Sequence, residues 1–281
     1  MNPVASPTQP SLVSAQPQPR ATKPISIAVV IAGRDAAAHA GEMLESLAAQ
    51  TRLPEEVVFF DDGSQDETRS IVESFQNRLP MLKVVGSETS LGISAARNRA
   101  AEYVTADFIA VLDADDLLTP EALAHYERML ECQPDSDLVY GDSLVFTGTP
   151  QQGVTMHYPA FASRGQAMRQ VLAAPLLPLK HSSILMRRRA LEQLGGYDES
   201  FPIKVDIELF LRFLDAGKKV RKLNQTISQH RKHAHQVSTK RIAGIRAYRR
   251  LFQRYEPNRF LRLPLFLTRA SAELMKCLVR G

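Results

Sequence analysis

Tryptophan is absent from this 281-residue chain, and only two cysteines, Cys132 and Cys277, are present. Two cysteines so far apart exclude a disulfide framework and a cysteine-rich zinc cluster, and they are typical of a reducing compartment. No apolar run approaches the roughly 18–20 residues that cross a bilayer. The N-terminus lacks a charged region followed by an apolar one, so we expect no secretory signal. These absences predict a cytoplasmic protein.

The composition predicts one sizeable hydrophobic core, flanked by an N-terminal and a C-terminal segment of different composition. Hydrophobic residues make up 44% of the chain and charged residues 23%, which excludes disorder for most of it. Residues 1–23 hold five of the seventeen prolines and are expected to form a disordered leader. Residues 240–281 carry eleven basic and two acidic side chains, a net charge of +9, whereas the rest carries 24 basic and 28 acidic, a net −4. A nucleic-acid partner is therefore not expected.

Short apolar runs rich in β-branched residues alternate with helical patterns along the first half of the chain. The expected strands are 26–31, 57–60, 82–85, 108–112 and 138–140, and the expected helices are 37–49, 66–77, 94–103 and 120–131. Runs without internal alternation are typical of strands buried on both faces. The sequence therefore predicts an α/β domain with a largely parallel, doubly wound sheet.

Acidic side chains follow two of these strands, at the point where each strand ends. Asp61 and Asp62 follow the second strand, and Asp113, Asp115 and Asp116 follow the fourth. In doubly wound folds ligands bind beyond the carboxyl ends of the strands, so we expect both groups at one edge of the sheet. Carboxylates gathered there favour Mg²⁺ or Mn²⁺, bound together with substrate phosphates. The alternative is that these residues only cap helices and form turns.

A succession of short motifs over residues 25–238 resembles the family 2 glycosyltransferases, which are inverting enzymes with a GT-A fold. The matching segments are 26–31, 50–51, 60–64, 91–98, 112–116, 181–185, 195–199, 206–212 and 230–233. No single motif is specific, but their order and spacing are. The resemblance implies a Rossmann-like GT-A domain at 24–238, whose mostly parallel sheet is flanked by helices. The leader at 1–23 would precede this domain, and a basic, amphipathic helical tail at 239–281 would follow it.

The resemblance also implies a reaction and its site. The reaction would transfer a hexosyl or N-acetylhexosaminyl group from a nucleotide-sugar, above all a UDP-sugar, to a glycan or lipid-linked acceptor. The product would serve cell-envelope or exopolysaccharide synthesis, and the cofactor would be Mn²⁺ or Mg²⁺. Seven positions match the family's functional residues. The matches are Asp35, Asp62, Arg97 and Asp113 for the nucleotide-sugar, Asp115 and His233 for the metal, and Asp206 for the catalytic base.

The chemistry of inverting transfer requires one carboxylate that stands apart from the metal cluster. A base must take the acceptor proton on the face opposite the leaving group, while the metal neutralises the departing diphosphate. Asp206 lies some ninety residues after Asp115 and suits that role. Alternatively, Asp206 and Glu208 only charge the first turn of a helix. Arg97 and His233 could likewise be solvated surface side chains.

Two departures from the family pattern leave other interpretations open. Arg34 stands where an aromatic residue usually follows the first strand, and Val205 replaces the glutamate that usually precedes the base. These changes leave room for a non-catalytic scaffold docked to a membrane complex. A nucleotidyltransferase would share the strand-end carboxylates, but residues 32–35 are a poor version of its triphosphate-binding loop. His181 fits either the edge of the core or an acceptor site.

The tail alternates arginine with large apolar residues. Arg246, Arg249, Arg250 and Arg254 recur at near-helical spacing. Such a segment is typical of a helix that lies on an anionic membrane surface, here the inner face of the cell membrane. The alternative is a pair of packing helices whose arginine face is only solvated.

Overall fold

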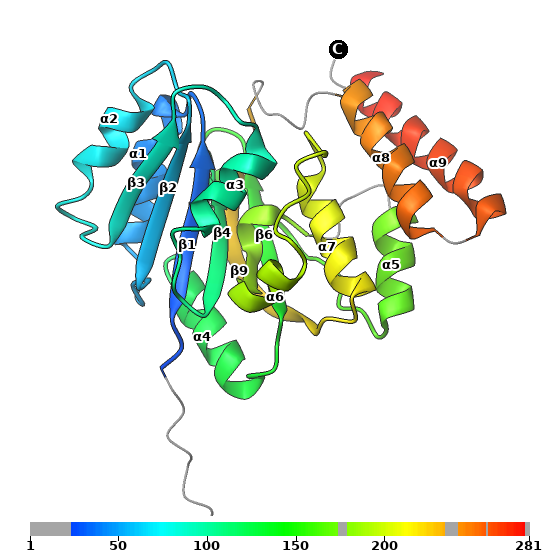
Figure 1. The fold of residues 1–281 in the computed structure, drawn as a ribbon, viewed down its shortest axis with the longest axis horizontal. Coiled ribbons are helices and arrows are strands. Elements are labelled where there is room, and N and C mark those ends of the chain that lie inside the picture. Colours follow the sequence, from blue (N-terminus) through cyan, green and yellow to red (C-terminus); the bar gives the residue numbers. More distant parts are fainter. Residues whose placement is uncertain (1–23, 174–178, 234–240, 257, 279–281) are drawn as a thin grey trace, which may run out of the picture.

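One central sheet carries helices on both faces (Figure 1). The computed structural model describes residues 24–173, 179–233, 241–256 and 258–278, so the predicted leader at 1–23 lies outside the described residues. The strands are β1 (Ile27–Gly33), β2 (Glu56–Asp62), β3 (Leu82–Ser87), β4 (Phe108–Asp113), β5 (Leu117–Leu118), β6 (Leu138–Phe146), β7 (Val154–Met156), β8 (Ile184–Arg187) and β9 (Val220–Arg231). The helices are α1 (Ala37–Ala48), α2 (Thr68–Ser74), α3 (Ile93–Ala101), α4 (Ala122–Cys132), α5 (Arg164–Ala173), α6 (Arg188–Gln193), α7 (Val205–Asp215), α8 (Arg241–Tyr255) and α9 (Arg259–Leu278). Two short 3₁₀ turns, η1 (Pro150–Gln152) and η2 (His181–Ser183), complete the elements.

The strand order is β3-β2-β1-β4-β8-β6-β9-β5, with β7 paired to β6. Strands β1 to β4 pair in parallel, so their carboxyl ends share one edge, as the sequence predicts. The remainder is mixed, because β8 runs antiparallel to both β4 and β6, whereas β6 and β9 are parallel. The predicted α/β class is confirmed, but the sheet is less parallel than expected.

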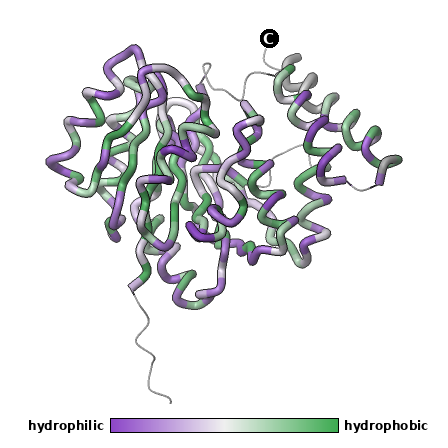
Figure 2. Tube along the Cα trace, in the orientation of Figure 1, coloured by the Kyte–Doolittle hydropathy of each residue, from purple (hydrophilic) through white to green (hydrophobic). Residues whose placement is uncertain are grey.

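Two apolar layers cover the faces of the sheet. Side chains of β1 alternate between them, with Val30 on one face and Val29 on the other. Helices α1, α2 and α4 cover the face of Val29, and α3, α5, α6, α7 and α8 cover the face of Val30. The strands in the middle of the molecule form a hydrophobic band (Figure 2). Burial on both sides explains why β1 reads as a continuous apolar run.

The tail is helical, as predicted, and it packs on the domain. Helices α8 and α9 lie together at the end of the molecule opposite β3 (Figure 1). Tyr248, Leu251 and Phe252 of α8 are fully buried in the core that α7 also lines. Among the described segments, the helices are too short or too polar to cross a membrane.

Candidate functional site

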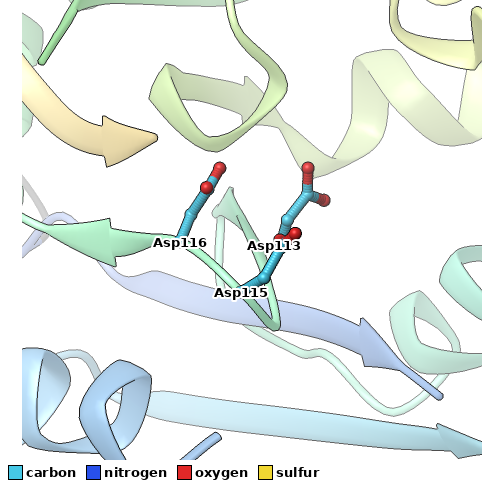
Figure 3. A group of neighbouring side chains, drawn as sticks. All are labelled: Asp113, Asp115 and Asp116. Carbon is cyan, nitrogen blue, oxygen red and sulfur yellow. The ribbon is translucent and has the colours of Figure 1, made fainter. Parts of the chain in front are cut away.

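Three carboxylates gather at the turn that follows β4. One carboxylate oxygen from each of Asp113, Asp115 and Asp116 lies within 4.8 Å of the others. Figure 3 shows the three side chains on this turn. The turn lies close against the end of β1, since a Cβ added to Gly33 would come 2.9 Å from Cβ of Ala114. Glycine at this position therefore lets the first strand end directly beside the acidic turn.

Asp116 is the buried anchor of the cluster, with 1% of its surface exposed. Its carboxylate accepts a 2.6 Å hydrogen bond from Ser182 Oγ and a 3.0 Å bond from the backbone N–H of Arg231. The ring nitrogen Nδ1 of His230 lies 3.0 Å from the same carboxylate. Since its oxygens are already occupied, Asp116 fixes the turn against η2 and β9.

Asp115 is more accessible and faces His233. The Nε2 atom of His233 lies 2.8 Å from Asp115 Oδ2, and the ring of His39 lies 5.1 Å from that of His233. Burial raises the pKa of Asp115, and the charges of Asp116 and Asp113 raise it further. A cation that binds beside such a carboxylate stabilises its ionised form.

Asp113 is held ionised by a cation from α3. Its carboxylate pairs with the guanidinium of Arg97, which is 5% exposed, whereas Asp113 is 31% exposed. Burial alone would raise the pKa of Asp113, but Arg97 and His181 outweigh it and hold that pKa well below its usual range. His181 Nδ1 lies 3.8 Å from Asp113, and its Nε2 lies 3.1 Å from Tyr197 Oη. Burial and then the charge of Arg97 lower the pKa of His181, so its imidazole is neutral at pH 7.

Replacing Arg97 with methionine is expected to lower the free energy of unfolding by up to about 3 kcal/mol at neutral pH. Because Asp113 is partly exposed, this loss of stability should not exceed the low end of the losses that follow removal of one partner from a buried ion pair. In the wild type the depressed pKa of Asp113 stabilises the fold above its unfolded pKa of about 3.9, and this contribution is lost as the pH falls further. In the variant, burial still raises the pKa of Asp113, and the guanidinium that opposed this shift is gone. The loss of stability of the variant, relative to the wild type, should therefore become smaller as the pH falls from about 7 to about 5.

Urea denaturation at the two pH values measures this effect. Arg99→Met is the matched control, because Arg99 lies on the same helix with its side chain 57% exposed and should change stability by less than about 0.5 kcal/mol. A loss at Arg97 that is the same at both pH values would show that the pair does not control the ionisation of Asp113.

Asp62 holds a loop beside the acidic turn. Its carboxylate accepts hydrogen bonds from Ser90 Oγ at 2.7 Å, from the N–H of Leu91 at 2.6 Å and from the N–H of Gly92 at 3.1 Å. Gly63 has φ of +72°, and a Cβ there would come 2.9 Å from the N atom of Ser90. The loop at 90–92 is thus fixed by residues of the acidic motif after β2. A contact between Asp62 and a nucleobase stays a prediction.

Asp35 links the loops that follow β1 and β2. Its N–H donates to Ser64 Oγ at 3.0 Å, and its Oδ1 accepts from the N–H of Gln65 at 2.8 Å. Arg34 Nε lies 3.3 Å from the other Asp35 oxygen, with both side chains about half exposed. The nucleotide-binding role of Asp35 stays a prediction.

Asp206 lies in the first turn of α7, near two side chains that also lie near the acidic turn. Its charge raises the pKa of His181 and of Lys180, and His181 also faces Asp113. Burial lowers the pKa of Lys180, while the charges of Asp116, Asp206 and Asp113 oppose that shift. Asp206 is therefore near the cluster without being one of its members.

Glu208, two residues further along α7, makes buried contacts with neighbouring side chains. It is 1% exposed and accepts hydrogen bonds from Arg212 Nη2 at 2.7 Å and Tyr255 Oη at 2.9 Å. Arg254 Nη1 lies 3.2 Å from it. Glu208 thus ties α7 to α8.

The donor set fits a divalent cation. Three carboxylates and a histidine supply the hard oxygen and imidazole ligands that Mn²⁺ accepts. Asp113 is engaged by Arg97 and Asp116 by three donors. Asp115, with His233 beside it, is therefore the ligand best placed to hold an ion. An ion held by one or two carboxylates leaves coordination positions for substrate phosphates.

The structure brings Arg97, Asp113, Asp115 and His233 together directly, and Asp206 through His181. Sequence reasoning missed the partners that shape this cluster. They are Ser182, His230 and the backbone of Arg231 around Asp116, and Lys180, which interacts electrostatically with Asp116 and Asp206. A signal was available for Ser182, because residues 181–183 stand directly before the apolar strand β8, but the polar, half-exposed strand β9 gives none for His230.

Comparison with known proteins gives a family match and a fold match. The sequence model described as glycosyl transferase family 2 matches residues 26–195. The chain is 28% identical to the putative glycosyltransferase EpsE of Bacillus subtilis, over 63% of this chain and 62% of EpsE. It is 29% identical to the succinoglycan biosynthesis protein ExoU of Rhizobium meliloti, over 71% of this chain and 60% of ExoU. The matched region thus spans about three fifths of the length of these curated relatives.

A solved structure shares the fold. The crystal structure of S. aureus TarS 1–349 in complex with UDP matches 86% of this chain and 70% of that one. The TM-score is 0.62 and the sequence identity 18%. This likeness confirms the predicted GT-A architecture.

Proposed function

The chain belongs to glycosyl transferase family 2, and we propose that it transfers a sugar, with inversion, from a nucleotide-sugar to a hydroxyl of a carbohydrate or lipid-linked acceptor. The observation that carries the proposal is the placement of Asp206 beside a separate cluster of three carboxylates. Inverting transfer needs this division of labour between a base and a site for the diphosphate.

Asp206 is the proposed base. Its carboxylate takes the proton of the acceptor hydroxyl while that oxygen forms the new bond to the anomeric carbon. The bond from the anomeric carbon to the diphosphate oxygen breaks on the opposite face, and the nucleoside diphosphate leaves with the bonding electrons. The neutral imidazole of His181 and the side chain of Lys180 each interact electrostatically with both Asp206 and Asp113, so both are close enough to orient the reacting groups.

Asp115, with His233, would hold Mn²⁺ or Mg²⁺. When bound, such an ion neutralises charge on the departing diphosphate. Arg97 keeps Asp113 ionised, so that its carboxylate can accept hydrogen bonds from the donor's ribose. Asp62 fixes the loop after β3, and Asp35 links the loops after β1 and β2. These loops would form the wall of the nucleotide site.

The donor is proposed to be a UDP-sugar carrying a hexosyl or N-acetylhexosaminyl group. Structures of TarS hold UDP and UDP-GlcNAc, which supports a uridine nucleotide on this fold. The names of ExoU and of a mycobacterial PGL/p-HBAD biosynthesis glycosyltransferase, 33% identical over 66% of this chain, support an envelope or exopolysaccharide acceptor. We further propose that the protein works in the cytoplasm, at the inner face of the membrane.

A thermal-shift titration with UDP, GDP, CDP and TDP, each with Mn²⁺ or with EDTA, tests the donor site. One nucleotide, UDP, is expected to raise Tm by about 5–10 °C at about 100 times its Kd, and only with Mn²⁺, because a ligand that binds only the folded state stabilises it. The absence of a shift with all four would favour the non-catalytic scaffold. A shift with nucleoside triphosphates, followed by pyrophosphate release from a sugar phosphate, would establish a nucleotidyltransferase instead.

A further inference from the structure

Helices α8 and α9 present one face to the domain. Tyr248 and Phe252 of α8 are buried in the core, and Phe266 of α9 packs against the same core. The buried guanidinium of Arg269 lies 4.4 Å from the centre of the Tyr248 ring and donates to the carbonyl of Val171 at 3.4 Å. These contacts fix which side of each helix faces outward.

The outward side of α9 is apolar. Phe260 is 87% exposed, Leu263 is 63% exposed and Leu267 is 53% exposed. Their spacing of three and four residues places them in one row along the helix, and Pro264 is exposed beside them. We name Phe260, Leu263 and Leu267 the apolar row. Scattered exposed leucines need no explanation, but a contiguous row on one face of a helix indicates a binding surface.

The outward side of α8 carries cations. Ile242, Arg246, Arg249 and Gln253 recur at helical spacing and are all exposed. Within the described residues, Arg246 and Arg249 make no hydrogen bond or ion pair with protein groups. By contrast, Arg250 donates to the carbonyl of Ser200 at 2.6 Å. We name Arg246 and Arg249 the arginine pair.

We propose that this outer face of α8 and α9 lies on an anionic lipid surface, with the apolar row among the upper acyl chains and the arginine pair at the lipid phosphates. Amphipathic helices that combine a basic side with exposed Phe and Leu bind bilayers in this way. Arg246 and Arg249 are exposed on this face, so pairing it with a second copy would bring like charges together. An anionic surface complements both features.

The location of this face links it to the proposed function. Arg250 and Arg254 of α8 bind Ser200 and Asp198, in the segment that leads into α7 and its first-turn Asp206. The ammonium of Lys204, just before α7, lies 5.4 Å from the centre of the Tyr248 ring. The helices that meet the membrane are thus braced against the segment that carries the proposed base. Only this link rests on the proposed function, because lipid binding does not require catalysis.

Co-sedimentation of the full chain with vesicles tests the proposal. Vesicles of phosphatidylcholine with phosphatidylglycerol should bind the protein at least about tenfold more tightly than phosphatidylcholine alone, and salt should weaken that binding. Leu263→Gln with Leu267→Gln should weaken it by at least about tenfold, because both side chains leave the acyl region. Arg246→Gln with Arg249→Gln should remove most of the preference for the anionic lipid.

The matched control is Leu53→Gln with Arg128→Gln. It also removes an exposed leucine and an exposed arginine, but from other surfaces, and it should bind as the wild type does. An unchanged melting temperature of each variant shows that it is folded.

Wild-type protein that stays in the supernatant, or a leucine variant that binds normally, would overturn the proposal. A dimer in light scattering that the leucine variant dissociates, without lipid binding, would assign the face to self-association. Lipid binding without any nucleotide-induced shift would leave this inference standing and refute the proposed function.

Discussion

Replacing Asp206 with asparagine is expected to lower kcat for sugar transfer by about 10²–10⁴-fold, the usual contribution of a general base. The amide keeps the size of the side chain but cannot take the proton of the acceptor hydroxyl. Nucleotide binding should be unchanged, because Asp206 is not a member of the carboxylate cluster. Steady-state transfer assays, together with a UDP titration of the same variant, measure the two effects separately.

Glu208→Gln is the matched control, since it makes the same chemical change two residues along α7. Glu208 is buried and accepts hydrogen bonds from Arg212 and Tyr255, so its replacement should cost about 1–3 kcal/mol of stability with much smaller loss of kcat in the folded enzyme. If Asp206→Asn retained wild-type kcat, Asp206 would not be the base. If neither the wild type nor the variants turned over any donor, the result would favour the non-catalytic scaffold.

Replacing Asp115 with asparagine is expected to have opposite effects on the free and the ligand-bound protein. The raised pKa of Asp115 means that its ionised form destabilises the folded state at neutral pH. Removing the charge should therefore raise Tm of the ligand-free protein by about 2–4 °C, which corresponds to roughly 1 kcal/mol. The same change should abolish the additional stabilisation by UDP with Mn²⁺, because the amide is a poor ligand for a hard cation.

Asp215→Asn provides the control. Asp215 is an exposed carboxylate at the end of α7 whose partner is Arg164, and surface pairs of this kind contribute about 0–1 kcal/mol. This variant should retain the nucleotide-dependent shift in full. An Asp115→Asn protein that melts below the wild type and still responds to UDP with Mn²⁺ would place the metal elsewhere.

Strands β1, β2 and β4 could be predicted because burial on both faces makes each a short apolar run. The edge strand β3 is mostly half-exposed and could be identified from Leu82, Val84 and Val85. The 12-residue strand β9 could not, since its residues are mostly half-exposed and include Asn224, Gln225 and Gln229. Its strand structure depends on pairing with β6 and β5, and such long-range partners leave no periodic signal in the sequence. For the same reason the predicted sheet is more parallel than the real one.

The candidate site divides in the same way. Asp113 and Asp115 could be identified because they follow an apolar strand of a predicted parallel sheet. The contacts of Ser182 and His230 with Asp116 could not be predicted, because these two residues lie 66 and 114 residues away from it along the chain. Arg97 lies on the buried side of α3, and only the folded structure shows that it meets Asp113 there.

The most direct test of the central claim is a calorimetric titration of the wild-type protein with UDP, once with Mn²⁺ and once with EDTA. If the acidic turn after β4 holds a metal-bound nucleotide, one UDP should bind per chain with Mn²⁺, and the affinity should fall at least about tenfold in EDTA. Equal affinity under both conditions would contradict a metal-dependent donor site, and no binding under either would contradict the proposed donor altogether.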